Sequence, residues 1–252
     1  MAILVSKRKT GTVTELVKTV LYAMGIALIV RTLAYEPFNI PSGSMIPTLL
    51  VGDFLFVSKF SYGYSRHSLP FSLPLIPGRI LMTEPERGDV VVFKVKKLDE
   101  NGRVVYIDFI KRLVGLPGDE IQVVHGILHI NGAPVQRERV ADFVVRASAS
   151  MIRRTPQYTE ILPNNRRHSI LEETDEGPYD MTPVYKVPEG HFFMMGDNRD
   201  NSADSRADIG FVPKENLVGR AEFLFFSIDG SFAEFWNWPH SIRFSRLFKA
   251  ID

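Results

Sequence analysis

The sequence predicts a mainly β protein, an antiparallel sheet or barrel that follows one N-terminal transmembrane helix. Two observations support this fold class. Short β-branched and aromatic runs alternate with Gly, Pro and Asn turns over most of the chain, as in antiparallel sheets. One long apolar run lies near the N-terminus, from Leu16 to Tyr35, and only Lys18 and Arg31 interrupt it. Helix-period segments do not alternate with the strands, which argues against a doubly wound α/β fold.

The apolar run is long enough to cross a membrane. As a helix rising 1.5 Å per residue it would reach about 30 Å, the thickness of the hydrocarbon core. Its uncharged centre, Thr19 to Val30, is short, so a buried core helix and a cleaved signal peptide remain alternatives. The lack of a polar face disfavours a core helix, and Thr32-Leu33-Ala34 is a poor cleavage site. We therefore expect a transmembrane helix over residues 16–35.

The charges before the apolar run predict its orientation. Lys7, Arg8, Lys9 and Lys18 precede its uncharged centre, and positive charges favour the cytoplasmic side. Residues 1–15 are then a basic cytoplasmic tail of a single-pass inner (plasma) membrane protein. Residues 36–252 are expected to form the catalytic domain on the periplasmic, or extracytoplasmic, side.

The remainder of the chain supplies the strands in order. The expected strands are Phe54–Lys59, Val90–Phe93, Val104–Val114, Ile121–His125, Ile127–Ile130, Phe192–Met195 and Leu217–Phe226. Gly63 to Arg79 is rich in Ser and Pro and is expected to be a loop. The more polar stretch within residues 126–190 is expected to be an appended β subdomain or a long excursion.

Composition removes several classes of function. The 252 residues carry a net charge of +1, which argues against a nucleic-acid partner. There is no cysteine, so disulfides, iron–sulfur clusters, thiolate zinc and a cysteine nucleophile are excluded. His125 and His129 flank a hairpin glycine and do not form a helical zinc pair. Asp200, Ser202 and Asp204 resemble the start of a calcium loop, but the later Gly and Glu of such a loop are missing. No metal and no cofactor are expected.

Three segments contain candidate catalytic residues. The first, Ile40 to Thr48, is a Pro- and Gly-bracketed turn that presents two serines. The second is the strand around Lys111, which shares a face with Ile107, Phe109 and Leu113. The third, Gly196 to Arg206, is dense in Asp, Asn, Ser and Arg and is typical of a hydrogen-bonded loop.

The lysine is the unusual residue among these. An apolar face disfavours the ammonium ion and lowers its pKa from about 10.4. Asp108 and Arg112 fall on the opposite face of the strand, where they could pair with each other. None of the three segments contains a histidine, and a serine nucleophile with a neutral lysine as its base needs none. An ordinary connector and a snorkelling lysine are the alternatives for the first two segments.

In these segments the chain resembles bacterial signal peptidase I (leader peptidase), a family of membrane-bound serine proteases. The family's nucleophile box matches Ser42 to Thr48, its core strand box Arg87 to Phe93, its lysine box Lys111 to Asp119, and its last box Gly196 to Arg206. The four boxes occur in the family's order. The resemblance implies a signal-peptide-bearing precursor as substrate and the lipid bilayer as a second partner.

The resemblance also implies roles for single residues. Ser44 would attack the scissile carbonyl and Lys111 would take its proton. The Ser44 N–H and the Ser42 hydroxyl would form the oxyanion hole, and Ser202 would hydrogen-bond the Lys111 amine and orient it. Asp204 and Arg206 would be structural supports, with Arg112 pairing nearby. The family's substrate-pocket positions fall on Phe38, Ile40, Pro41, Met45, Leu49, Phe109 and Ile110.

Some alternatives remain open at this point. A self-cleaving repressor-type Ser-Lys protease is one, although it would need a helix-turn-helix segment before the nucleophile. A membrane-tethered β module that binds extended peptides is another. Near the C-terminus, Phe232, Phe235, Trp236 and Trp238 fit either insertion at the membrane interface or core packing. The small triplet Ala147-Ser148-Ala149 would permit self-cleavage, although a plain loop fits it better.

Overall fold

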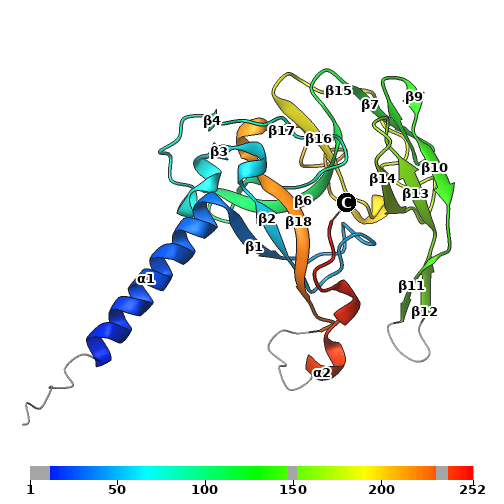
Figure 1. Ribbon diagram of the computed structural model, residues 1–252. Helices are drawn as coiled ribbons and strands as arrows, with labels where there is room; N and C mark the ends of the chain where they lie inside the picture. The colour runs from blue at the N-terminus through cyan, green and yellow to red at the C-terminus, as the bar shows by residue number, and fades with distance from the viewer. Residues whose placement is uncertain (1–11, 147–151, 231–237, 252) are drawn as a thin grey trace, which may run out of the picture.

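The computed structural model describes residues 12–146, 152–230 and 238–251 (Figure 1). A long helix, α1 (Thr12–Leu33), leads into a β domain, which confirms the predicted fold class. The helix starts four residues earlier than expected and ends two residues earlier, because Tyr35 already belongs to the first strand. Lys7 to Lys9, on which the predicted orientation partly depends, lie outside the described residues.

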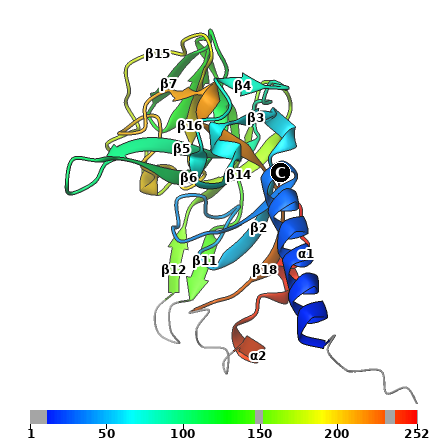
Figure 2. The same cartoon turned by 90° about the vertical axis from the view of Figure 1, so that its left-hand side faces the viewer.

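Helix α1 has the length and composition of a membrane span. Val13–Leu33 has a mean hydropathy of 1.8 over its most apolar window, and none of that window is buried in the protein. A core helix would be buried, so this alternative is removed. Figures 1 and 2 show α1 projecting from the β domain.

The β domain holds the C-terminal end of α1 through polar contacts. Glu36 accepts from Arg31 at 2.7 Å and pairs with the buried Lys59 at 2.8 Å. The Tyr64 hydroxyl donates to the carbonyl of Leu33 at 2.7 Å. These contacts fix the direction in which the helix leaves the sheet.

The main element is a seven-stranded antiparallel sheet in the order β1-β2-β18-β5-β6-β16-β17. Its strands are β1 (Tyr35–Asn39), β2 (Asp53–Ser58), β5 (Val90–Leu98), β6 (Val104–Gly115), β16 (His191–Met195), β17 (Val212–Pro213) and β18 (Leu217–Ser227). Five of the sequence-predicted strands are among them. The second and the last strands of the chain lie side by side, since β2 pairs with β18.

Most of the chain between β6 and β16 forms smaller sheets. One has the order β15-β7-β8-β9, a second has the order β10-β13-β14, and a hairpin pairs β11 with β12. Earlier in the chain, between β2 and β5, β3 pairs with β4. The bounds are β3 (Tyr64–Ser65), β4 (Arg79–Ile80), β7 (Glu120–Val124), β8 (Ile127–Ile130), β9 (Ala133–Pro134), β10 (Gln136–Arg139), β11 (Phe143–Arg146), β12 (Ile152–Thr155), β13 (Gln157–Ile161), β14 (Arg167–Leu171) and β15 (Tyr185–Lys186). The expected excursion at 126–190 is therefore built of strands, and β7 joins it.

Three hydrophobic clusters fill the domain. Along β5 the side chains alternate: Val90 and Val92 pack in one cluster, while Val91 and Phe93 pack in another. Both faces of this strand are thus buried, which explains its unbroken run of apolar residues. A third cluster lies between the end of β6, β16 and the small sheet of β7 and β8, so these sheets share a core.

A short helix near the C-terminus, α2 (Trp238–Ser241), follows β18 in the described part of the chain. Trp238 packs against Phe226 of β18, with ring centroids 5.6 Å apart. Phe232, Phe235, Trp236 and the triplet Ala147-Ser148-Ala149 lie outside the described residues. In both views α1, α2 and the β11–β12 hairpin extend from the same end of the β domain (Figures 1 and 2).

Candidate active site

Ser44 lies in the turn that joins β1 to β2. Met45 and Leu49 anchor this turn, because both are fully buried in the cluster beneath it. From the other side Asn198 fixes the backbone: its side-chain amide donates to the Gly43 carbonyl at 3.0 Å, and its N–H donates to the Ser44 carbonyl at 3.1 Å. The serine is therefore held in a rigid position.

The Ser44 hydroxyl meets the Lys111 amine. Lys111 Nζ lies 2.5 Å from Ser44 Oγ, although the two residues are 67 positions apart in sequence. Lys111 is 3% exposed and Ser44 is 9% exposed. The two predicted chemical groups thus form one buried hydrogen-bonded pair.

Burial lowers the pKa of Lys111 from 10.5 to about 8. Arg206 contributes to this lowering of the pKa, while Asp204 and Asp197 act in the opposite direction. The apolar surroundings are provided by β6 itself, where Phe109 and Leu113 pack in one cluster. Ile107 does not contribute as expected, since it is 44% exposed. With a pKa near 8, about a tenth of the amine is neutral at pH 7.

Ser42 shares the space in front of this pair. Its Oγ lies 3.5 Å from Ser44 Oγ, and its side chain borders the same cleft. A group bound beside Ser44 would therefore meet the Ser42 hydroxyl as well.

The loop from Gly196 to Arg206 packs directly behind Ser44. Asp204 binds the Arg206 guanidinium at 3.0 and 2.9 Å and accepts from the Gly196 N–H at 3.0 Å. A Cβ at Gly196 would overlap Ser202 Oγ and lie 2.5 Å from the Ser44 carbonyl oxygen. Only glycine lets the loop approach the serine this closely.

Ser202 differs from expectation in one respect. Its hydroxyl is buried next to Gly196 but has no hydrogen-bond partner among the described residues, so the expected bond to Lys111 is not present. The lysine donates to Ser44 instead.

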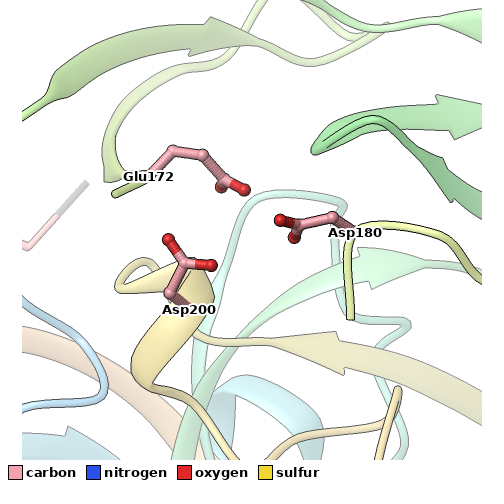
Figure 3. Close-up of side chains that lie close together, drawn as sticks. All are labelled: Glu172, Asp180 and Asp200. Carbon is pink, nitrogen blue, oxygen red and sulfur yellow. The ribbon is translucent and has the colours of Figure 1, made fainter. Parts of the chain in front are cut away.

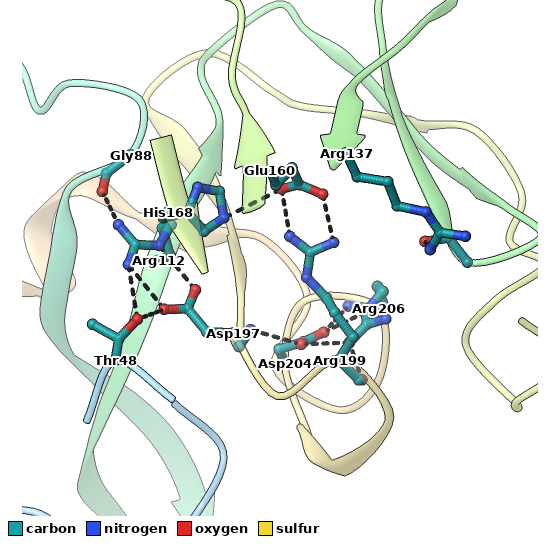
Figure 4. A network of polar contacts seen from close by, with 12 residues as sticks. Thr48, Gly88, Arg112, Arg137, Glu160, His168, Asp197, Arg199, Asp204 and Arg206 are labelled. Carbon is teal, nitrogen blue, oxygen red and sulfur yellow. Dashed lines mark hydrogen bonds and ion pairs between the residues drawn. The ribbon is translucent and has the colours of Figure 1, made fainter. Parts of the chain in front are cut away.

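Arg112 also pairs differently from the prediction. It binds Asp197 through two hydrogen bonds of 2.8 Å, and Thr48 Oγ1 donates to the same carboxylate at 2.5 Å (Figure 4). The pairing of Arg112 with Asp108 that their shared face allows does not form, because Asp108 pairs with Lys94 across the strands at 2.7 Å. This buried pair joins β6 to the loop from Gly196 to Arg206, and Thr48 connects both to the turn that carries Ser44.

A second buried pair was not predicted. Arg199 binds Glu160 of β13 at 2.9 and 2.6 Å, and His168 Nε2 of β14 lies 3.2 Å from the same carboxylate (Figure 4). Burial alone would raise the pKa of Glu160, but Arg199 and His168 lower it. Glu160 and Arg199 are 39 positions apart and belong to no common motif, so the sequence does not indicate that they pair.

Ser44 and Lys111 open into a cleft of about 700 Å³. Five of the seven expected pocket residues line it: Phe38, Ile40, Pro41, Phe109 and Ile110. The other two, Met45 and Leu49, do not line it, because both are fully buried under the nucleophile turn. Sequence reasoning missed a further part of the lining, which includes Phe143, Val145, Arg153 and Thr155 of the β11–β12 hairpin.

One edge of β6 faces this cleft. β5 pairs with β6 along its whole length, whereas β16 pairs with it only from Arg112 to Gly115. The Val104–Lys111 edge opposite β5 has no strand partner among the described residues. Such an edge accepts an extended peptide as an added strand.

Comparisons with known proteins point to a single family. Residues 13–226 match the model of the family described as signal peptidase, peptidase S26. Signal peptidase I of Rickettsia typhi is 38% identical over 249 residues, covering 91% of this chain and 90% of that protein. Signal peptidase I of Rickettsia canadensis is 37% identical over 256 residues, covering 93% and 92%. A crystal structure of a signal peptidase I from Enterococcus faecalis is 26% identical and covers 55% of this chain and 97% of its own, with a TM-score of 0.29.

Proposed function

Because the chain belongs to the signal peptidase, peptidase S26 family, whose activity is the cleavage of signal peptides, we propose that Ser44 is its nucleophile and Lys111 its general base. The observation that carries the proposal is the buried contact of 2.5 Å between Lys111 Nζ and Ser44 Oγ. A serine needs an adjacent base to be nucleophilic, and Lys111 lies within proton-transfer distance.

The amine must be neutral before it can accept a proton. Burial supplies this condition, since it lowers the pKa of Lys111 to about 8. Ser44 Oγ then attacks the scissile carbonyl carbon while its proton moves to Lys111 Nζ. The resulting ammonium returns the proton to the departing amine, which leaves an ester between Ser44 and the signal peptide. Water, deprotonated by the same amine, hydrolyses this ester and frees Ser44.

When Ser44 attacks, negative charge develops on the oxygen of the scissile carbonyl, and hydrogen-bond donors are needed to stabilise it. We assign them to the Ser44 N–H and the Ser42 hydroxyl, which shares the space in front of Ser44 Oγ. A donor of this kind is worth about 3 kcal/mol in the transition state. Ser42 is exposed and can turn toward the developing charge without leaving a buried hydroxyl unpaired.

The substrate would bind as an extended strand along β6. The open edge of that strand supplies backbone hydrogen bonds, while alternate side chains of the peptide enter the cleft. Phe38, Ile40, Phe109 and Ile110 make the pocket walls near Ser44 apolar. We propose that they select small apolar side chains at the −1 and −3 positions, with Pro41 bordering the same space.

The remaining residues hold this geometry. Asp204 and Arg206 stabilise the loop behind Ser44, and Arg112 ties β6 to that loop through Asp197. Ser202 is buried beside Gly196 and is proposed to orient the Lys111 amine when substrate is bound.

We further propose that α1 anchors the enzyme in the inner membrane, with the N-terminus in the cytoplasm. The exposed apolar surface of α1 supports an anchor, and the basic residues before it support the orientation. In this arrangement residues 1–15 are cytoplasmic and residues 36–252 form the extracytoplasmic catalytic domain. The cleft wall formed by the β11–β12 hairpin then lies on the membrane side, where signal peptides arrive (Figure 1).

Cleavage of a purified precursor tests the dyad. The full chain in detergent micelles should process the precursor, and Ser44→Ala and Lys111→Ala should each lose activity by at least about a thousandfold. Ser245→Ala and Lys96→Ala are matched controls, because both side chains are exposed and lie outside the cleft. Processing at the wild-type rate by either dyad variant would overturn the proposal.

Protease protection tests the topology. In sealed inner-membrane vesicles with the cytoplasmic face outward, residues 36–252 should resist added protease until detergent opens the vesicle. Digestion of this domain in intact vesicles would contradict the proposed orientation.

A further inference from the structure

Three carboxylates converge beside the loop that supports Ser44. Glu172 follows β14, Asp180 lies farther along the same connection, and Asp200 lies in η4 (Arg199–Asn201). One oxygen of each lies within 4.8 Å of the others, and Figure 3 shows the three side chains directed toward a common space. They come together through the fold, since the chain between them does not follow a metal-binding motif.

Glu172 is the most unusual member of the group. It is 3% exposed, and neither of its carboxylate oxygens has a hydrogen-bond partner among the described residues. Asp180 is 1% exposed, and its Oδ1 also has no partner there, whereas Oδ2 accepts from the Gly177 N–H at 2.6 Å. Buried carboxylates without partners are strongly unfavourable, so such groups are normally paired or bound to a metal.

The nearest cations are already paired elsewhere. Arg199 binds Glu160 with both terminal nitrogens, and Arg206 binds Asp204. No ion pair joins the described cations to Glu172, Asp180 or Asp200 within 4.0 Å. The pKa of Glu172 is raised to about 9, chiefly by burial and also by Asp200 and Asp180, while Arg199 and Arg206 act in the opposite direction. The three acids therefore lack a positive partner.

Two glycines leave room at the cluster. A Cβ at Gly126, in the turn between β7 and β8, would lie 2.8 Å from Glu172 Oε1. A Cβ at Gly177 would lie 2.8 Å from Asp200 Oδ1 and 3.0 Å from Asp180 Oδ2. Any larger residue at these positions would crowd the carboxylate oxygens.

We propose that Glu172, Asp180 and Asp200 bind one calcium ion. Calcium takes hard oxygen ligands at about 2.4 Å, so two oxygens on one ion can lie up to about twice that distance apart, which the 4.8 Å limit satisfies. Magnesium requires a tighter octahedral shell and retains its waters, so this loosely spaced set of oxygens favours the larger ion. Backbone carbonyls and water would complete the coordination.

The ion would connect two segments that border the catalytic centre. Glu172 and Asp180 belong to the β14–β15 connection, and Asp200 begins the turn that leads to Ser202 and Asp204. The neighbours Glu173 and Asn201 line the cleft. Calcium would thus stabilise one wall of the cleft and the loop behind Ser44. The sequence-based rejection of a calcium loop running from Asp200 through Asp204 is unaffected, because Asp204 pairs with Arg206 and the proposed ligands are different.

Calorimetric titration and thermal unfolding of the full chain in detergent, after treatment with a chelator, test the site. The Ser44→Ala chain is used, so the result does not depend on peptidase activity. We expect one calcium ion per chain, and a Tm that rises by about 3–6 °C when free calcium exceeds Kd tenfold. Magnesium at the same concentration should give less than half of this shift.

Glu172→Gln should weaken calcium binding at least tenfold and remove the shift. Asp200→Asn, at a partly exposed position, provides a second variant that is expected to fold if the first does not. Glu176→Gln is the matched control, because Glu176 is exposed in the same connection and outside the cluster. A Tm that does not respond to calcium, an equal response to magnesium, or unchanged binding by both cluster variants would overturn the proposal.

Discussion

Replacing Lys111 by Met should stabilise the protein while abolishing cleavage. At pH 7 the folded chain must hold a buried ammonium ion, and the fall of its pKa from 10.5 to about 8 measures that penalty. About 2.5 pKa units correspond to about 3.4 kcal/mol. Met keeps the length of the side chain without the charge. It also removes the hydrogen bond to Ser44, which costs about 1 kcal/mol, so the net gain is about 2 kcal/mol.

The stability that Lys111→Met gains over the wild type should decrease as pH rises. Below pH 8 the lysine is protonated in both the folded and the unfolded chain, so the wild type carries the full penalty. Between pH 8 and 10.5 the unfolded chain binds more protons than the folded chain, so the wild type gains stability as pH rises. The advantage of Lys111→Met therefore declines over this window, and by pH 10 it should have disappeared.

Thermal unfolding followed by circular dichroism measures this effect. At pH 7 the Tm of Lys111→Met should exceed that of the wild type by about 4–8 °C. Lys96→Met, at an exposed position on the neighbouring strand, should leave the Tm unchanged. A Lys111→Met chain less stable than the wild type at pH 7, or an advantage independent of pH, would refute the reasoning that Lys111 is strained by desolvation.

Three further predictions follow from the same geometry. Since the pKa of Lys111 is about 8, kcat/KM for precursor cleavage should rise about tenfold per pH unit below pH 8 and level off above it; an acid limb centred near pH 6.5 would indicate another base. Arg112→Ala should lower the free energy of unfolding in urea by about 3–5 kcal/mol, because it leaves the Asp197 carboxylate buried without its partner. The double change Arg112→Met with Asp197→Leu should recover most of that loss, and failure to do so would argue against the charge pair as the cause. Gly196→Ala should lower kcat more than tenfold with little change in KM, because the added Cβ pushes the loop away from Ser44; wild-type kinetics would show that the close approach is not needed.

Local patterns predicted the elements of this protein well. Alternating and β-branched runs located β2, β6, β7, β8, β16 and β18 to within a few residues, because a strand's side-chain period is visible in sequence. The ends of α1 were displaced, since apolarity does not distinguish the last turn of a helix from the first residue of an apolar strand such as Tyr35.

Contacts between distant segments could not be predicted in the same way. Period two correctly separates Asp108 from Lys111, but the partner of each charge depends on strand register, and Asp108 pairs with Lys94 of β5. The same limit explains why Asp197 was not recognised as the partner of Arg112. Met45 was placed in the pocket from the resemblance alone, whereas packing directs it into the core.

The acidic cluster and the hairpin wall of the cleft show the same limit on a larger scale. Phe143 and Val145 alternate as in any strand, and their sequence does not indicate that they face Ser44 across the cleft. Glu172 and Asp200 meet only because β14 bridges to the loop at Asn198. Features formed by tertiary contacts of this kind require the three-dimensional structure.

The central claim is that Ser44 forms the covalent intermediate with Lys111 as its base. The most direct measurement is rapid-quench mass spectrometry of the full chain after mixing with a signal-peptide ester that is cleaved at the same position as the precursor. The wild type should gain one acyl group, located on Ser44 by peptide mapping, within a single turnover. Lys111→Arg, which keeps the charge but cannot act as a base, should gain none. An acyl group on another residue, or acylation of Lys111→Arg at the wild-type rate, would contradict the mechanism.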